Sequence, residues 1–236
     1  MITGFVFGFD DKQSTFILSG WIFNYLKFVI LSFIAWIVYF LTQNHFSKVY
    51  GCNIDYKIWS IERFGFAKGA HLPLKFGKLT IKKIPLGIIL PILISFLSDG
   101  GLYFTAVISS IVSIVPAYRL GRMFTKLTEI EEAKVAVSGP LSLIGLAVLI
   151  KIFDVEPLNE LVLVSSMIAL SNMFPLPGLD GIKVLFGSRL WYIFSASFVL
   201  ASAFLLNFVS GFSALILGLL IALFVLFHYF YKKNQS

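Results

Sequence analysis

The sequence is poor in charge and in cysteine, and each shortage excludes a class of protein. Only 13% of its 236 residues are charged, whereas 58% are hydrophobic, and the mean hydropathy is +0.90. This balance excludes an ordinary soluble domain and indicates an integral membrane protein. The single cysteine, Cys52, excludes an intramolecular disulfide. Acidic residues are also scarce, with 12 Asp and Glu in the chain, so each one near an apolar segment deserves inspection.

The N-terminus does not resemble a secretory signal, and the placement of the basic residues argues against a nucleic-acid-binding protein. The first residues lack the basic region of a secretory signal, and Asp10 and Asp11 precede the first apolar run. The net charge of +7 arises in loops between apolar segments, where it suits membrane topology and lipid headgroups. The basic run 75–83 is interpreted in the same way. Membrane lipids are therefore expected partners, and nucleic acid is not.

The apolar segments predict an all-α polytopic membrane protein with about 6–7 membrane segments. Residues 21–42 match the ~20 residues that a helix needs to cross the hydrocarbon core. Two shorter apolar runs and four helical spans are expected at 84–98, 102–117, 134–153, 158–175, 190–208 and 211–231. The run 102–117 is rich in Val, Ile, Ser and Thr, so strands and a re-entrant hairpin are both open. Without repeats or low-complexity linkers, residues 1–236 are expected to form one membrane domain, with a core at 21–190 and extra C-terminal spans at 190–231.

Local patterns add a small β element and one helix start to this architecture. Polar and apolar residues alternate around 54–59, which predicts short strands near the membrane surface. The segment from Thr128 to Glu131 fits a capping box, so a helix should begin there. The adjacent carboxylates of Glu129, Glu131 and Glu132 suit the dipole of that helix start better than a metal site.

The distribution of Lys and Arg predicts which loops are cytoplasmic. If residues 84–117 cross and return, 16 of the 19 basic residues lie on one face, in loops 43–83, 118–134 and 176–190 and in the C-terminal tail. The positive-inside rule places that face in the cytoplasm. We therefore expect an integral protein of the cell membrane, with loops 43–83 and 118–134 and the C-terminus in the cytoplasm.

The segment 171–181, Ser-Asn-Met-Phe-Pro-Leu-Pro-Gly-Leu-Asp-Gly, ends a long apolar run and places Asp180 at its edge. Pro, Gly and Asp are turn formers, so an ordinary turn leaving the bilayer is one interpretation. A functional site is the other, because an ionisable group at the edge of a membrane span is costly. Composition alone leaves both interpretations open.

Three short motifs follow one another along the chain. Residues 133–141 end in Ser-Gly-Pro-Leu, residues 172–181 contain Asn-x-x-Pro-x-Pro-x-Leu-Asp-Gly, and residues 181–184 continue as Gly-Ile-Lys-Val before Trp191. In this order they resemble the motifs of the site-2 protease family of intramembrane zinc metalloproteases, in its archaeal-type members. The likeness covers about residues 30–195. It implies a substrate groove with candidate residues Gly139, Pro140, Asn172, Pro175 and Pro177.

The resemblance implies zinc chemistry, but the residues that carry this chemistry are absent. In the family, His-Glu-x-x-His supplies two zinc ligands and the general base, and the aspartate of Leu-Asp-Gly is the third ligand. Alignment on residues 48–51 places Tyr39, Phe40 and Gln43 at the His, Glu and His positions. Tyr39 and Gln43 are poor zinc ligands, and Phe40 cannot transfer a proton. Leu143 stands where the family has an asparagine near the substrate.

The three histidines of the chain do not compensate for this loss by their spacing. On a helix, His45 would project about 200° away from Gln43. His71 lies in the basic loop, and His228 lies at the end of the last span. Each is interpreted as an interfacial or loop histidine.

We therefore expect a site-2 protease-like pseudoenzyme that binds or scaffolds membrane segments without cleaving them, and no cofactor. Asp180 is expected to remain as a vestigial ligand within reach of Tyr39 and Gln43. Strand edges around 54–59 and 102–115 would receive an extended peptide from the membrane segments of other proteins. The alternatives are an active intramembrane zinc metalloprotease with relocated ligands, and a small transporter or channel whose polar pathway Asp180 lines.

Overall fold

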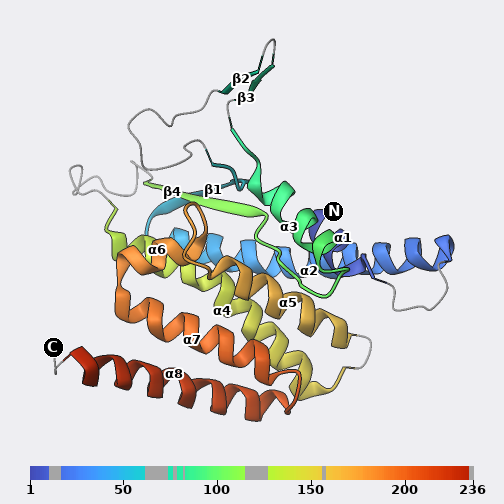
Figure 1. Ribbon diagram of the computed structural model, residues 1–236. Coiled ribbons are helices and arrows are strands. Elements are labelled where there is room, and N and C mark those ends of the chain that lie inside the picture. Colours follow the sequence, from blue (N-terminus) through green and yellow to red (C-terminus); the bar gives the residue numbers. More distant parts are fainter. Residues whose placement is uncertain are drawn as a thin grey trace.

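The computed structural model describes residues 1–10, 17–61, 74–76, 79–81, 83–114, 127–155 and 158–233. Its helices are α1 (Ile2–Gly8), α2 (Leu18–Val49), α3 (Leu86–Leu97), α4 (Glu129–Phe153), α5 (Asn159–Asn172), α6 (Asp180–Gly187), α7 (Arg189–Leu205) and α8 (Gly211–Lys233). Its strands are β1 (Cys52–Ile58), β2 (Leu74–Phe76), β3 (Leu79–Ile81) and β4 (Ile108–Ile114). Figure 1 shows α4, α5 and α7 packed together, with α2 and the β1–β4 sheet on one flank and α8 on the other.

Among the described residues, three helices are long and apolar enough to cross a membrane, namely α2, α4 and α8. They contain 32, 25 and 23 residues, against the ~20 that a span requires. The chain is therefore a membrane-embedded, mostly helical protein, but the expected number of about 6–7 membrane segments was too high. Helices α5 and α7, expected as full spans, have only 14 and 17 residues, so hydropathy alone overstated the number of spans. Helix α3, expected as a short run, has 12 residues.

The predicted β element near residues 54–59 is confirmed, and the strand, one of the two alternatives left open for residues 102–117, is found at Ile108–Ile114. Strand β1 pairs antiparallel with β4, from Cys52 opposite Ile114 to Ile58 opposite Ile108. The apolar run after α3 therefore contains a strand. Its β-branched residues favour a pleated strand, and pairing with β1 satisfies backbone groups that a lone segment would leave open. Strands β2 and β3 form a second antiparallel pair.

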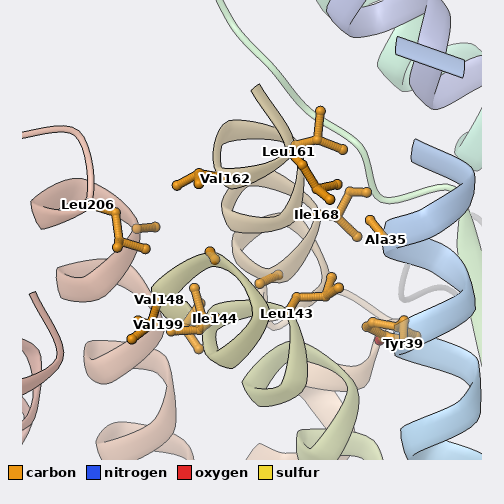
Figure 2. Close-up of a cluster of buried hydrophobic side chains, with 14 of the residues drawn as sticks. Ala35, Tyr39, Leu143, Ile144, Val148, Leu161, Val162, Ile168, Val199 and Leu206 are labelled. Atoms are coloured by element: carbon orange, nitrogen blue, oxygen red, sulfur yellow. The ribbon is translucent and has the colours of Figure 1, made fainter. Parts of the chain in front are cut away.

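The hydrophobic core lies between α2, α4, α5 and α7, and it fixes the C-terminal half of α2 against α4. Figure 2 shows Leu143 of α4 directed toward Ala35 and Tyr39 of α2. Leu143 is fully buried, so the position that carries an asparagine in the resembled family is a core position here. The cluster is completed by side chains of α4, α5 and α7 and by the residue that follows α7: Ile144, Val148, Leu161, Val162, Ile168, Val199 and Leu206.

Helix α4 begins at the predicted capping box, which is confirmed. The Thr128 hydroxyl accepts a hydrogen bond from Glu131 N over 3.3 Å, and the Glu131 carboxylate accepts one from Thr128 N over 3.1 Å. Glu129, Glu131 and Glu132 occupy the first turn, where their charge complements the helix dipole. The helix therefore starts at Glu129, five residues before the predicted span 134–153.

Candidate functional site

Asp180 is the first residue of α6, directly after the loop that follows α5. Two glycines shape this turn. Gly178 has a φ of +92°, which other residues rarely adopt, and the Trp59 ring lies where its side chain would begin. A Cβ on Gly181 would lie 2.2 Å from the carbonyl oxygen of Met173, so a larger residue would push α6 away from α5. The turn thus carries Asp180 into the interior, where it is 3% exposed.

One oxygen of Asp180 is held by α2. Tyr39 Oη and Gln43 Nε2, one helical turn apart, both donate hydrogen bonds to Asp180 Oδ2, and the Gln43 bond measures 2.6 Å. All three side chains are buried. The predicted approach of Asp180 to the Tyr39–Gln43 segment is therefore confirmed. Both positions that align with zinc-binding histidines carry hydrogen-bond donors to the carboxylate.

Gly139 of α4 leaves the space that Tyr39 and Gln43 need to reach Asp180. A Cβ added to Gly139 would lie 2.6 Å from Tyr39 Cζ and 2.9 Å from Gln43 Nε2. Gln43 Nε2 also donates to the carbonyl of Ala136 over 3.2 Å. Gly139 therefore forms the floor of the carboxylate site, a different place from the open substrate groove in which it was expected.

The other oxygen of Asp180 faces β4 and the first turn of α6. Ser110 Oγ donates to Asp180 Oδ1 over 2.5 Å, and Lys183 Nζ lies 3.1 Å from the same oxygen. Lys183 also donates to the hydroxyl and to the backbone carbonyl of Ser110. Each carboxylate oxygen thus has two donors, and the buried negative charge has an ammonium partner. Such pairing is what allows a carboxylate to remain inside an apolar protein.

The β1–β4 sheet is fastened over the loop that precedes Asp180. Trp59 Nε1 donates to the carbonyl of Pro177 over 2.7 Å, and Ser109 Oγ donates to the carbonyl of Gly178 over 2.5 Å. Trp59 is 1% exposed and packs beneath Gly178. These bonds connect the sheet region to the loop and hold it next to the carboxylate.

Phe40 occupies the position of the general base of the resembled family and contacts the sheet. Its ring packs on Tyr56 of β1, with ring centroids 4.3 Å apart. Burial, and next the negative charge of Asp180, raise the pKa of the Tyr56 hydroxyl above its ordinary value. Tyr56 is therefore neutral at physiological pH. This part of the site combines an aromatic contact with an uncharged hydroxyl.

The remaining groove candidates lie in different places. Pro140 is buried within α4, and Asn172 Nδ2 donates to the carbonyl of Ile168 over 2.9 Å inside α5. The carbonyl of Pro177 is held by the sheet, as described above. Pro175 lines an apolar groove of about 160 Å³ between α5 and α7, together with Leu170, Met173, Phe174, Tyr192, Ala196 and Leu200. The structure thus separates residues that the motifs group together.

The donors around Asp180 do not fit a zinc ion. Protein zinc sites use Cys, His, Asp and Glu, and no group of three or more such residues occurs among the described residues. The carboxylate oxygens accept hydrogen bonds from four side chains: Tyr39, Gln43, Ser110 and Lys183. The Lys183 ammonium also puts a positive charge beside the oxygens that a metal would need.

The histidines do not lie at this centre within the described part of the chain. His45 is exposed on α2, beside the ring of Phe46 at 5.8 Å between centroids. His228 lies near the end of α8. His71 falls outside the described residues, so its predicted loop position is not addressed.

No sequence pattern indicated Ser110, Ser109 or Trp59 as site residues, and Lys183 was noted only as part of a motif. Ser110 lies 70 residues before Asp180, and Trp59 lies 118 residues before Pro177. Serine and tryptophan in a strand carry no local signal of such a contact. The strand composition of residues 102–117 was the one available sign, because it placed a strand where Ser110 lies.

Comparison with known protein families, with curated proteins and with solved structures found no match to this chain.

Proposed function

We propose that this chain is a site-2 protease-like pseudoenzyme that binds or scaffolds membrane segments without cleaving them. The observation that supports the proposal is the convergence of Tyr39 and Gln43 on one oxygen of Asp180. In the family that the motifs resemble, two histidines at these positions share a zinc ion with the aspartate. Here hydrogen bonds take the place of metal bonds, and Phe40 offers no group to activate water. The proposed function requires no cofactor.

The sheet beside the carboxylate supports a binding role. Within the described residues β4 pairs only with β1, so the outer edge of β4 has no strand neighbour. An unpaired edge can accept an extended peptide through main-chain hydrogen bonds, which is β-augmentation. Extended stretches next to the membrane segments of other proteins are the proposed partners at this edge. Lipids are the proposed neighbours of the exposed apolar faces of α2 and α8.

We place the Asp180 centre on the cytoplasmic side of the cell membrane. The positive-inside argument needs both ends of residues 84–117 on one face. The bridge between Ile61 and Ile84 and the pairing of β1 with β4 support this, because they bring the two ends to the same sheet region. Loops 43–83 and 118–134 and the C-terminus share that side in this arrangement.

Zinc content, measured by mass spectrometry on purified protein, tests the proposal. The wild-type chain and Asp180→Asn should carry equally little zinc, because neither has the histidine ligands. The triple variant Tyr39→His, Phe40→Glu, Gln43→His restores two ligands beside Asp180. It should bind about one equivalent of zinc, since a catalytic zinc takes three protein ligands and water.

Phe40→Glu alone is the matched control for the triple variant, because it adds the carboxylate without the histidines. Stoichiometric zinc in the wild type that disappears in Asp180→Asn would contradict the pseudoenzyme and favour a metalloprotease with relocated ligands. A folded triple variant that binds no more zinc than the control would count against the family resemblance.

A further inference from the structure

The two edges of β4 differ in what occupies them. Trp59 N donates to the carbonyl of Val107, which fixes the alternation of the antiparallel ladder. The backbone groups of Ser109, Ile111 and Ser113 therefore point to β1. Those of the alternate residues point to the outer edge: Ile108, Ser110, Val112 and Ile114. The contact of Lys183 with the Ser110 carbonyl agrees with this assignment.

The outer edge of β4 has none of the residues that usually protect a strand edge. Its sequence, Ile-Ser-Ser-Ile-Val-Ser-Ile, contains no charge and no proline. Edge strands are normally guarded by lysine, proline, bulges or short length, because open backbone groups recruit other strands. Strand β1, in contrast, carries Asp55 and Lys57. The protection of β4 must come from outside the strand.

Lys183 supplies a contact at this edge. Its ammonium bonds the Ser110 carbonyl, the Ser110 hydroxyl and Asp180 Oδ1 at once. The Lys183 side chain is 11% exposed and that of Asp180 is 3% exposed, so the pair is largely removed from water. An incoming strand would need the same Ser110 carbonyl as an acceptor. Lysine and an added strand therefore compete for one atom.

We propose that Lys183 is an autoinhibitory latch, which closes the outer edge of β4 against an extended peptide and holds the sheet over Asp180. Release of the ammonium frees the Ser110 carbonyl and opens the edge at the centre of the strand. This inference rests on the proposed function, because it takes the partner to be an extended segment that adds to β4. The partner expected at this edge is a peptide segment of uncharged, β-branched residues, because such residues match the composition of β4.

The test compares the full-length wild type with Lys183→Met, which keeps the stem and removes the ammonium. Lys183→Arg keeps the cation, and Lys57→Met removes an exposed lysine from the neighbouring strand. Hydrogen exchange at the Ser109 and Ile111 amides, which point to β1 in the ladder, is measured without any peptide. Lys183→Met should raise exchange there by about tenfold or more, because local opening becomes easier. Lys183→Arg and Lys57→Met should match the wild type.

A second measurement uses a biotinylated heptapeptide of alternating Thr and Val, crosslinked through a photoreactive group at position 112. Lys183→Met should crosslink at least about five times more peptide than the wild type, because the edge is open. Unchanged exchange in Lys183→Met would overturn the latch, even if peptide bound to every variant. Raised exchange without crosslinking in any variant would support the latch and contradict strand docking as the function.

If Lys183→Met does not fold, the wild type alone decides. An amine-reactive reagent should modify Lys183 at least about ten times more slowly than Lys57, because Lys183 is bonded and largely buried. Adding the heptapeptide should then speed the reaction of Lys183. Equal reaction of Lys183 and Lys57 in the free protein would overturn the latch.

Discussion

The hydrogen-bond donors around the two oxygens of Asp180 determine whether this carboxylate is fixed or free to bind a ligand. The carboxylate receives two donors on each oxygen, from side chains of α2, β4 and α6. Removing one donor from a buried carboxylate leaves part of its charge unpaired, at a typical cost of about 1–3 kcal/mol. The arrangement therefore favours a fixed carboxylate over one that exchanges ligands.

Gly139→Ala should destabilise the protein, because the added methyl group enters the space of Tyr39 and Gln43. Overpacking of a tight interior typically lowers the free energy of unfolding by about 1–3 kcal/mol. The measurement is detergent-denaturant unfolding followed by tryptophan fluorescence. Gly145→Ala, in the same helix, is the matched control, since nothing lies within 4 Å of its added Cβ.

The control should change the free energy of unfolding by no more than about 1 kcal/mol, in the stabilising direction, because alanine favours helix more than glycine does. Equal destabilisation by both substitutions would show that helix α4 is sensitive to any added methyl group. The loss of stability could then not be attributed to the close packing of Gly139 on Tyr39 and Gln43.

Among the elements, the helices differ in how much of their surface the chain itself covers. In the most apolar 18-residue stretch of each helix, 61% of α4 is buried within the protein, whereas only 22% of α8 is. α8 touches the rest through a small-residue face formed by Ala214, Gly218 and Ala222. Small residues let helix backbones approach closely in a membrane, where apolar area alone gives no preference for helix over lipid.

Gly218→Leu should weaken the α7–α8 contact. A Cβ on Gly218 would already lie 2.5 Å from Ser202 Oγ of α7, so a leucine cannot fit without separating the helices. The expected loss of unfolding free energy is about 1–3 kcal/mol. Leu220→Ala is the control, because Leu220 is 56% exposed and should change stability by no more than about 0.5 kcal/mol. A stable Gly218→Leu protein would contradict the small-residue contact.

On the scale of the whole molecule, the two ends of the helix bundle differ in which elements they carry. Figure 1 shows the start of α4, helix α6 and the C-terminal end of α8 toward one end of the bundle. The C-terminal end of α4 and the start of α5 lie toward the other end. The described basic residues of the parts at the first end are Lys134, Lys183, Lys232 and Lys233, and these parts lie toward the end that also carries Asp180.

Cysteine labelling in intact cells tests this orientation. In a Cys52→Ser background, Glu129→Cys and Lys233→Cys should react only after the membrane is permeabilised. Val155→Cys, which lies in the turn between α4 and α5, should react with an impermeant maleimide from outside. This pattern is expected because the positive-inside rule puts the end of the bundle that carries Glu129 and Lys233 in the cytoplasm. External labelling of Glu129→Cys or Lys233→Cys would reverse the proposed topology.

Several features could be predicted from the sequence because each depends on residues that are close together in the chain. Composition determined the membrane class, the Thr128–Glu131 pattern determined the start of α4, and alternation near residues 54–59 determined a strand. The motif alignment also placed Asp180 beside Tyr39 and Gln43, 137 residues away from the latter, which the structure bears out. That contact was predictable only because the motifs resemble a family.

Only the tertiary structure decided the length of the spans, the role of residues 102–117 and the full set of donors around Asp180. Hydropathy does not measure helix length, so α5 and α7, with 14 and 17 residues, were expected as full spans. Ser110 and Lys183 meet at one carboxylate because β4 pairs with β1 and α6 turns back beneath the sheet. The composition of a strand is a local property, whereas the partner of a buried charge is set by packing across the whole chain.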